Sequence, residues 1–362
     1  MSEIAVHLPV NGVSFGQVSV GLLREMHKRE TSPCIFPVNP TSIDLSTQCV
    51  ETDFKKWLEG NINKSLGTHK RSDPIFKLWH LNGSLESYSD KQVLFTFYEL
   101  DQPTQQEINI ARNQHRVIVS SEYSKSILEN SGLNNVSYVP LFFDKESFKK
   151  KDKNYFTDDR VTFNLTGKFE KRKHHQKIIR AWAKKFGNNK RFSLQCATYN
   201  SFLKEEDNQN IINSILEGKA YDNISFLGYM SKNDLYNDFL NSGDVILACS
   251  GGEGWGLPEF HSVAMGKHAV TLNAHAYKGW ADESNSIFIN PTGKTEVYDG
   301  MFFLKGQPYN QGSIFDFDDE ELITACEQVI ERVGESRVNK AGLLLQEKFT
   351  VEKTLDGILE QF

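Results

Sequence analysis

Short apolar, β-branched and aromatic runs alternate along the chain with amphipathic stretches. The clearest runs lie at residues 4–8, 93–98, 116–120, 161–166, 223–228 and 244–249. Residues 121–132 have helical periodicity, with a serine at the start and a glycine at the end. Strands that alternate with helices are typical of βαβ units, and a continuous apolar run such as 245–249 indicates a strand covered on both faces. The pattern therefore predicts an α/β fold with parallel sheets.

The length of the chain predicts two domains, because 362 residues exceed what a single hydrophobic core usually organises. Residues 139–159 change abruptly to a lysine-rich polar composition, which favours a linker. We place the boundary at 143–156, with an N-terminal domain over 1–150 and a C-terminal domain over 151–362. Two doubly wound domains joined in this way bring the carboxyl ends of both sheets to one cleft, where such folds bind ligands.

Two loops that follow predicted strands have features of phosphate sites. Residues 7–26 place Gly16 in a loop that leads into a helix, where backbone amides can approach a phosphate. A tight turn explains the same glycine equally well. In residues 164–182, Lys168 and Lys173 flank a glycine turn at a spacing that lets both ammonium groups reach one diphosphate. The alternative is that these lysines only cap a surface loop.

A third loop, within residues 247–270, joins an apolar strand to a short helix through the glycine-rich sequence SGGEGWG. Pro258 stands where a first helical residue would stand, because its missing N–H costs nothing there. Glu253 lies inside the loop, where glycine alone would suffice for a turn. Because a carboxylate offers only acceptors, it suits the hydroxyl groups of a polar ligand. We therefore expect Glu253 to bind such a ligand.

The composition narrows the class of protein. With 39% hydrophobic and 24% charged residues, the chain is ordinary for a globular protein. The five cysteines form no CxxC pair, which argues against a disulfide framework or a zinc site and favours a reducing cytoplasm. The first residues lack the basic region and the length of a signal peptide, and no apolar run approaches the roughly 20 residues that span a bilayer. We expect a cytoplasmic protein without stable membrane insertion.

The net charge of −6 conceals an asymmetry. Residues 145–191 contain 16 Lys and Arg against 5 Asp and Glu, so this stretch carries +11 and the rest of the chain −17. Clustered basic charge attracts an anionic ligand such as a phosphate, a nucleic acid or a membrane surface. A solvated lysine-rich face explains most of these residues equally well.

Several motifs together resemble the retaining GT-B glycosyltransferases of the large family four, over most of residues 4–275. Residues 117–144 resemble the strand, helix and "IPNGVD" linker of that family. The sequence GKFEKRKH at 167–174 is similar to its G-R-L-x-x-x-K-G diphosphate loop, and residues 223–259 resemble its nucleobase strand and E-G-F-G-L-P signature. The chain also resembles the small glycosyltransferases carried by bacteriophages, for which the location is the cytoplasm of the host.

The resemblance implies a GT-B fold, in which two Rossmann-like domains face each other across a cleft and the last helix packs back on the first domain. It implies a nucleotide-sugar donor, with UDP the expected nucleotide, and no metal or further cofactor. Glu253 then orients the donor sugar and is not a covalent nucleophile. The residues implied to bind the donor are Gly16, Lys168, Lys173, Tyr229, Met230, Glu253, Gly254, Gly256, Leu257 and His261.

One departure from the family lies in the short helix. The family has a second Glu eight residues after the first, which binds the ribose diol, and this position is His261 here. Glu259 does not simply replace it, because two residues along a helix turn the side chain by about 200°. A neutral imidazole offers one donor and one acceptor, so we expect altered ribose binding that changes with pH near the histidine pKa of about 6.5.

A second departure lies at the end of the strand at 93–98. The family usually has a His beside the donor sugar where this chain has Tyr98, which makes Tyr98 and the adjacent Glu99 catalytic candidates together with Glu253. Asp101 and His80 are candidates on the acceptor side. The alternative for this segment is that it only shapes the pocket.

Two functions follow from these features. The first is transfer of a sugar from a UDP-sugar to a hydroxyl of a saccharide or small glycoside, or of a hydroxymethylated pyrimidine in DNA, whose backbone the basic stretch would suit. The alternative is a non-catalytic GT-B protein that binds a nucleotide sugar or a glycan. Tyr98 and His261 favour the alternative, whereas Glu253, Lys168 and Lys173 oppose it. The motifs leave the sugar and the oligomeric state open.

Overall fold

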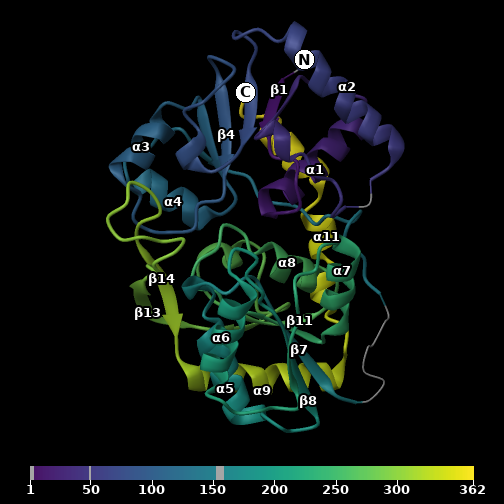
Figure 1. Cartoon of the computed structure of the whole chain (residues 1–362), viewed down its shortest axis with the longest axis vertical. Coiled ribbons are helices and arrows are strands. Elements are labelled where there is room, and N and C mark those ends of the chain that lie inside the picture. Colours follow the sequence, from purple (N-terminus) through teal and green to yellow (C-terminus); the bar gives the residue numbers. More distant parts are fainter. Residues whose placement is uncertain (1–3, 49, 152–158) are drawn as a thin grey trace.

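The chain forms two lobes, each built on a six-stranded parallel sheet (Figure 1). The computed structural model describes residues 4–48, 50–151 and 159–362. The first sheet has the strand order β2-β1-β3-β4-β5-β6. Its strands are β1 (Ala5–Leu8), β2 (Ile35–Pro37), β3 (Ile75–Leu78), β4 (Gln92–Thr96), β5 (Arg116–Val119) and β6 (Val136–Tyr138). Its helices are α1 (Ser14–Lys28), α2 (Thr52–Thr68), α3 (Gln105–Arg112) and α4 (Glu122–Asn130).

The second sheet has the order β12-β11-β10-β7-β8-β9. Its strands are β7 (Val161–Thr166), β8 (Phe192–Ala197), β9 (Ile224–Phe226), β10 (Val245–Ala248), β11 (His268–Leu272) and β12 (Ile287–Ile289). Its helices are α5 (His175–Phe186), α6 (Glu205–Leu216), α7 (Asn233–Ser242), α8 (Leu257–Ala264), α9 (Asp319–Glu335), α10 (Lys340–Leu343) and α11 (Leu345–Lys348). Both sheets are parallel with helices on their faces, so the predicted two-lobed, Rossmann-like α/β fold is confirmed.

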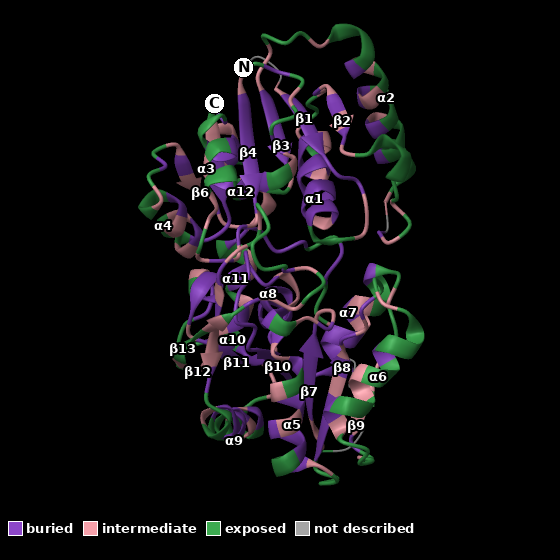
Figure 2. Ribbon diagram, turned by 60° about the vertical axis from the view of Figure 1, so that its left-hand side comes forward, coloured by how far each residue is buried: buried purple, intermediate pink, exposed green. Residues whose placement is uncertain are grey.

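Burial explains why the apolar runs become strands. All residues of β4 and β10 are buried, as parallel strands covered by helices require. Figure 2 shows these strands in the interior of each lobe, while the outer faces of α2 and α6 are exposed. Among the described residues, no helix is long and apolar enough to cross a membrane.

The last helix, α12 (Val351–Leu359), lies against the first lobe. Arg29, directly after α1, forms an ion pair with Asp356 at 2.5 Å, and the hydroxyl of Thr354 donates to the carbonyl of Pro140. The chain thus crosses between the lobes twice, once in each direction. The boundary predicted at 143–156 falls partly on residues 152–158, which lie outside the described residues.

A hairpin that the sequence did not predict joins the lobes at the side of the cleft. It consists of β13 (Pro291–Glu296) and β14 (Ser313–Phe317), which are antiparallel. Its connecting loop reaches α3 and α4 of the first lobe (Figure 1). There the carboxylate of Glu107 accepts a hydrogen bond from the amide of Asn310, and the hydroxyl of Thr104 donates to the carbonyl of Pro308.

Candidate functional site

The site begins at the carboxyl end of β10, where residues 249–256 form a fully buried loop before α8. Gly256 has φ of +79°, a left-handed conformation that favours glycine, and precedes the first turn of α8. A Cβ on Gly254 would lie 2.7 Å from the Cβ of Phe97 in the first lobe. Glycine therefore lets this loop touch the opposite sheet edge.

Direct hydrogen bonds hold the two lobes together around this loop. The hydroxyl of Ser120 in the first lobe donates to the carbonyl of Gly254 at 2.7 Å. Gln17 of α1 and Asn233 of α7 exchange two amide hydrogen bonds, at 3.0 and 2.9 Å. The structure is therefore in a closed arrangement, with the carboxyl ends of both sheets facing each other.

The Glu253 carboxylate lies in this loop with 7% of its side chain exposed. Its Oε1 pairs with Nη1 of Arg172 at 2.8 Å and with Nζ of Lys173. Burial opposes ionisation of Glu253, but the two cations outweigh it and hold its pKa well below the ordinary value. Glu253 is thus a fixed carboxylate, ionised across the physiological range.

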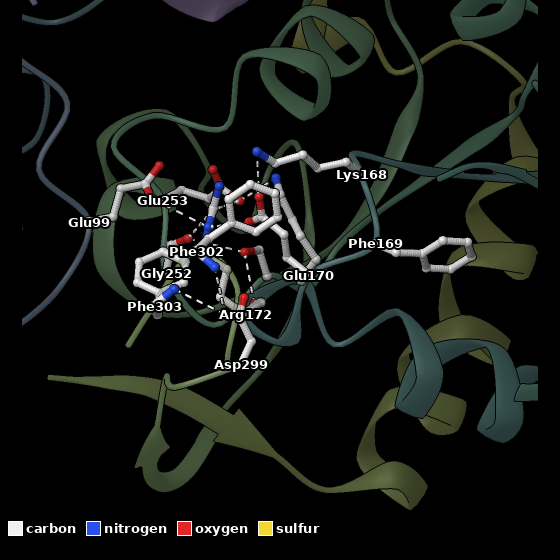
Figure 3. Close-up of polar contacts among 12 residues, drawn as sticks. Glu99, Lys168, Phe169, Glu170, Arg172, Gly252, Glu253, Asp299, Phe302 and Phe303 are labelled. Carbon is white, nitrogen blue, oxygen red and sulfur yellow. Dashed lines mark hydrogen bonds and ion pairs between the residues drawn. The ribbon is translucent and has the colours of Figure 1, made fainter. Parts of the chain in front are cut away.

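Arg172 is the centre of the cluster (Figure 3). Besides Glu253, Nη1 donates to the carbonyl of Gly252 at 2.7 Å. Its Nε lies 2.9 Å from Oε2 of Glu170 and 3.4 Å from Oε2 of Glu99, which comes from the first lobe. Neither Arg172 nor Glu170 was predicted from the sequence. Three cations follow one another at 171–173, and only the three-dimensional turn determines which of them face inward.

The two lysines predicted to bind a diphosphate lie on the same loop as Arg172. Lys173 is buried, and Gly167, with φ of +95°, makes room for it, because a Cβ there would lie 3.0 Å from the Lys173 Cε. Lys168 is one-third exposed and pairs with Glu170 at 2.7 Å. Its ammonium lies 4.0 Å from the ring centre of Phe302, in the loop between β13 and β14. Both lysines are therefore held by carboxylates of the site.

Glu259 lies deeper, behind Lys173. Its Oε1 accepts from the hydroxyl of Thr166 at 3.3 Å and lies 3.9 Å from the Lys173 ammonium. Burial raises the pKa of Glu259. Its Oε2 is buried and accepts no hydrogen bond from the described residues.

The structure turns His261 away from this cluster. Its Nδ1–H donates to the carbonyl of Leu257 at 2.6 Å, and its Nε2 accepts from the amide of Asp144 at 3.2 Å. The ring packs against Phe148 in the segment that leaves the first lobe. Burial lowers the pKa of His261 to about 4, so the imidazole is neutral at physiological pH. Both ring nitrogens are thus satisfied by the main chain, and His261 joins α8 to the linker.

Side chains at the end of β4 alternate in direction. Phe97 faces the glycine loop and Glu99 faces Arg172, whereas Tyr98 is buried in the core of the first lobe beside Leu94 and Val117. Burial raises the pKa of the Tyr98 hydroxyl far above its ordinary value. The structure therefore brings Glu99 into the site and leaves Tyr98 outside it.

The acceptor-side candidates also separate. Asp101 binds the hairpin, where its carboxylate pairs with Lys294 at 2.8 Å and accepts from the amide of Ser313 at 2.7 Å. His80 stays at the cleft. Its ring packs on Phe15, and desolvation together with the charge of Lys168 in the opposite lobe lowers its pKa.

The other predicted donor residues lie at three places, in the loop after β9, at the start of α8 and at the start of α1. Tyr229 is exposed after β9, with Met230 half-buried beside it, and Leu257 begins α8. Gly16 was expected in the loop before the helix, but it lies buried in the first turn of α1. A Cβ there would lie 2.2 Å from the carbonyl oxygen of Asn11, so glycine lets the preceding loop pack on the helix. No group of three or more His, Cys, Asp or Glu side chains within 4–48, 50–151 and 159–362 is arranged to hold a metal ion.

The fold is similar to those of solved glycosyltransferase structures. Sucrose-phosphate synthase from Thermosynechococcus elongatus superimposes with a TM-score of 0.71 at 12% identity, covering 99% of this chain and 98% of that chain. HepE from Anabaena, solved with UDP-glucose, has a TM-score of 0.66 at 13% identity, covering 99% and 98%. Trehalose 6-phosphate synthase from Burkholderia multivorans has a TM-score of 0.65 at 10% identity, covering 100% and 98%.

These identities are low, so the likeness concerns the fold. No model of a known protein family matches the sequence, and no curated protein matches it.

Proposed function

We propose that this protein is a retaining glycosyltransferase that moves a sugar from a UDP-sugar to a hydroxyl group. The observation that carries the proposal is the Glu253 carboxylate, ionised between Arg172 and Lys173 at the carboxyl end of β10, where the two Rossmann-like lobes meet. The fold it shares with HepE, a protein solved with UDP-glucose, favours a UDP-sugar as the donor.

The donor in this proposal lies along the loops of the second lobe. Lys168 and Lys173 neutralise the diphosphate, and Glu253 accepts hydrogen bonds from the sugar hydroxyls. Fixed positive charge stabilises the departing diphosphate because it is in place before the bond breaks. The remaining donor contacts come from Gly16, Tyr229, Met230, Gly254, Gly256 and Leu257.

The reaction is a displacement on one face of the sugar. The bond from the anomeric carbon to the diphosphate oxygen breaks, and a bond from the acceptor oxygen forms on the same face. The acceptor proton passes to a donor phosphate oxygen, so UDP leaves with it. The chain supplies positioning and charge and needs no covalent intermediate. No resident cofactor or metal takes part in these steps.

The acceptor that the site favours is a saccharide or small glycoside. Phe97 and Trp79 are partly exposed on the first lobe and pack on the buried ring of Phe15, with Phe15 and Phe97 stacked at 4.2 Å. Partly exposed rings of this kind suit the apolar face of a sugar. Many of the cations at 145–191 are paired with acids, among them Lys177 with Asp316, Lys184 with Glu320 and Lys185 with Glu327. The acids beside these lysines reduce the local excess of positive charge that a DNA backbone would use.

Non-catalytic binding of a nucleotide sugar is the second candidate. The observation that favours it is the loss of two family features from the site, because Tyr98 is in the core and both nitrogens of His261 are engaged by the main chain. Turnover separates the two candidates.

The test is UDP release from a panel of UDP-sugars by the wild-type protein and by Glu253→Ala. We expect slow release by the wild type, lost in Glu253→Ala and kept in Glu331→Ala, which removes an exposed carboxylate of α9. Binding of a donor without any release or transfer would support the non-catalytic candidate. If no donor of the panel binds, both the transferase and the non-catalytic candidate are contradicted.

A further inference from the structure

Arg172 belongs to the second lobe but contacts both lobes. The side chain of Arg172 is 10% exposed, and its guanidinium lies among carboxylates of three different segments. Glu170 precedes it on the same loop, Glu253 comes from the glycine loop after β10, and Glu99 comes from the end of β4 in the first lobe. Figure 3 shows these side chains converging on Arg172.

The fork of the guanidinium explains why an arginine stands here. Nη1 binds both the Glu253 carboxylate and the carbonyl of Gly252, so one group fixes the side chain and the main chain of the glycine loop. Nε faces the other two carboxylates. A lysine carries the same charge on a single nitrogen and cannot reproduce this planar fork.

We propose that Arg172 is a positioning residue, which holds the Glu253 carboxylate in the donor pocket and couples it to Glu99 of the acceptor lobe. The proposal rests on the proposed function. In the structure, Glu99 of the first lobe meets the Nε side of the guanidinium while Nη1 holds Glu253. The donor pocket is therefore completed by a contact from the lobe that carries the acceptor.

The charges around Glu99 make this coupling sensitive to pH. Glu99 faces the cations Arg172 and Lys173 and the carboxylates Glu170 and Glu253. Burial raises the pKa of Glu99 to about 7, against the opposing effect of Arg172. Glu99 is therefore ionised and paired above pH 7, and protonated below it. Loss of Arg172 raises this pKa further.

The experiment uses Arg172→Met, Arg172→Lys and the isosteric Glu99→Gln, with Lys171→Met as the control. Lys171 is the adjacent cation; it is exposed, and its ammonium donates a hydrogen bond to the carbonyl of Tyr298. UDP release from UDP-glucose is measured between pH 5.5 and 8.5. Calorimetry measures the affinities for UDP and UDP-glucose, and thermal unfolding confirms that each variant is folded.

We expect Arg172→Met to lower kcat by about 100-fold, since misplacing an orienting group by about 1 Å has that effect. Its affinity for UDP stays within threefold of the wild type, whereas any gain in affinity from the glucose moiety is lost. Arg172→Lys recovers less than a tenth of the lost rate. Glu99→Gln lowers kcat about fivefold and removes the rise in rate around pH 7. Lys171→Met behaves as the wild type.

Three results would overturn the proposal. A loss of UDP affinity in Arg172→Met that parallels the loss of rate would make Arg172 a diphosphate ligand. Full activity in Arg172→Lys would show that charge alone suffices. An unchanged pH profile in Glu99→Gln would break the link to the first lobe, and this variant decides the matter if Arg172→Met does not fold.

Failure of the proposed function has a different signature, namely a wild type that releases no UDP from any donor. In that case the binding data still test Arg172, because a positioning residue contributes to the affinity for UDP-glucose beyond that for UDP. If Arg172→Met keeps that increment, the proposal is wrong.

Discussion

The two sheet edges that meet at the cleft are built from opposite chemistries. The edge of the second lobe carries Arg172, Lys173 and Glu253, paired into one buried cluster. The edge of the first lobe is aromatic, with Phe15 stacked on Phe97, and contributes the carboxylate of Glu99. In the proposed function, the charged edge binds the diphosphate of the donor and the partly exposed rings of the aromatic edge bind a sugar. Four substitutions test this division, from the largest expected effect to the smallest.

The charged edge is tested most strongly by Lys173→Met. We expect UDP affinity to fall about 100-fold, because Lys173 is buried and its charge is little screened. Lys168→Met is the matched comparison, with a loss of about tenfold, because Lys168 is one-third exposed. Removal of Lys173 also leaves Glu253 with one cation fewer, so the free energy of unfolding falls by about 3 kcal/mol. Equal losses of UDP affinity in the two variants would contradict the difference in burial.

The contact between the two edges is tested by Gly254→Ala. The added methyl group lies 2.7 Å from the Cβ of Phe97, so the lobes or the loop must move apart. We expect the free energy of unfolding to fall by about 1–3 kcal/mol and UDP release to slow about tenfold. Gly293→Ala is the control, because a Cβ there meets nothing within 4 Å. Unchanged turnover in Gly254→Ala would show that the close approach has no functional role.

The aromatic edge is tested by Phe97→Leu. We expect the acceptor KM to rise about fivefold, a loss of about 1 kcal/mol, while UDP release without acceptor stays within twofold. Tyr88→Leu is the control, because Tyr88 stacks on Phe36 with the same 4.2 Å separation at another place in the first lobe. A larger effect of Phe97→Leu on the donor than on the acceptor would assign this edge to the donor.

The smallest effect on activity is expected for His261→Gln. Both ring nitrogens bind main-chain groups, so UDP affinity at pH 7 changes less than twofold. The variant instead alters the dependence of stability on pH. The pKa of His261 is about 4 in the folded protein and about 6.5 when unfolded, so the unfolded state binds the extra proton. The contribution of the neutral ring to the free energy of unfolding is fully present above pH 6.5 and is lost as the pH falls through 4. This contribution is at most about 3 kcal/mol.

Denaturant unfolding at pH 7 and pH 4.5 measures this effect, and His261→Gln removes the acid-sensitive part. A tenfold loss of UDP affinity in this variant at pH 7 would instead support the ribose contact expected from the sequence.

Much of the fold could be predicted from local patterns. The apolar runs became β1, β4, β5, β7, β9 and β10. All of these except the edge strand β9, which is partly exposed, are mostly buried, as covered parallel strands require. The hairpin β13 and β14 was missed because Pro291–Glu296 is a mostly polar, partly exposed strand. Its position depends on long-range contacts such as Lys294 with Asp101, which no local pattern encodes.

A candidate site residue can be proposed from the sequence where its residue type has little structural reason to be present. Glu253 in a glycine loop is such a case. Arg172 was not, because it is one of three consecutive cations and only the turn at 171–173 decides which of them face inward. The direction of the Tyr98 side chain was not predicted. Side chains alternate along the end of β4, so Phe97 and Glu99 face the second lobe, whereas Tyr98 faces the core of the first lobe.

The most direct measurement is the mass of the products formed when the protein is incubated with mixed UDP-sugars and candidate acceptors, including saccharides, small glycosides and hydroxymethylated duplex DNA. A charged donor edge opposite an aromatic acceptor edge predicts UDP release together with the addition of one sugar residue to a saccharide or glycoside, both lost in Glu253→Ala. Transfer to DNA alone would contradict the acceptor assignment, and donor binding without any product would contradict the transferase itself.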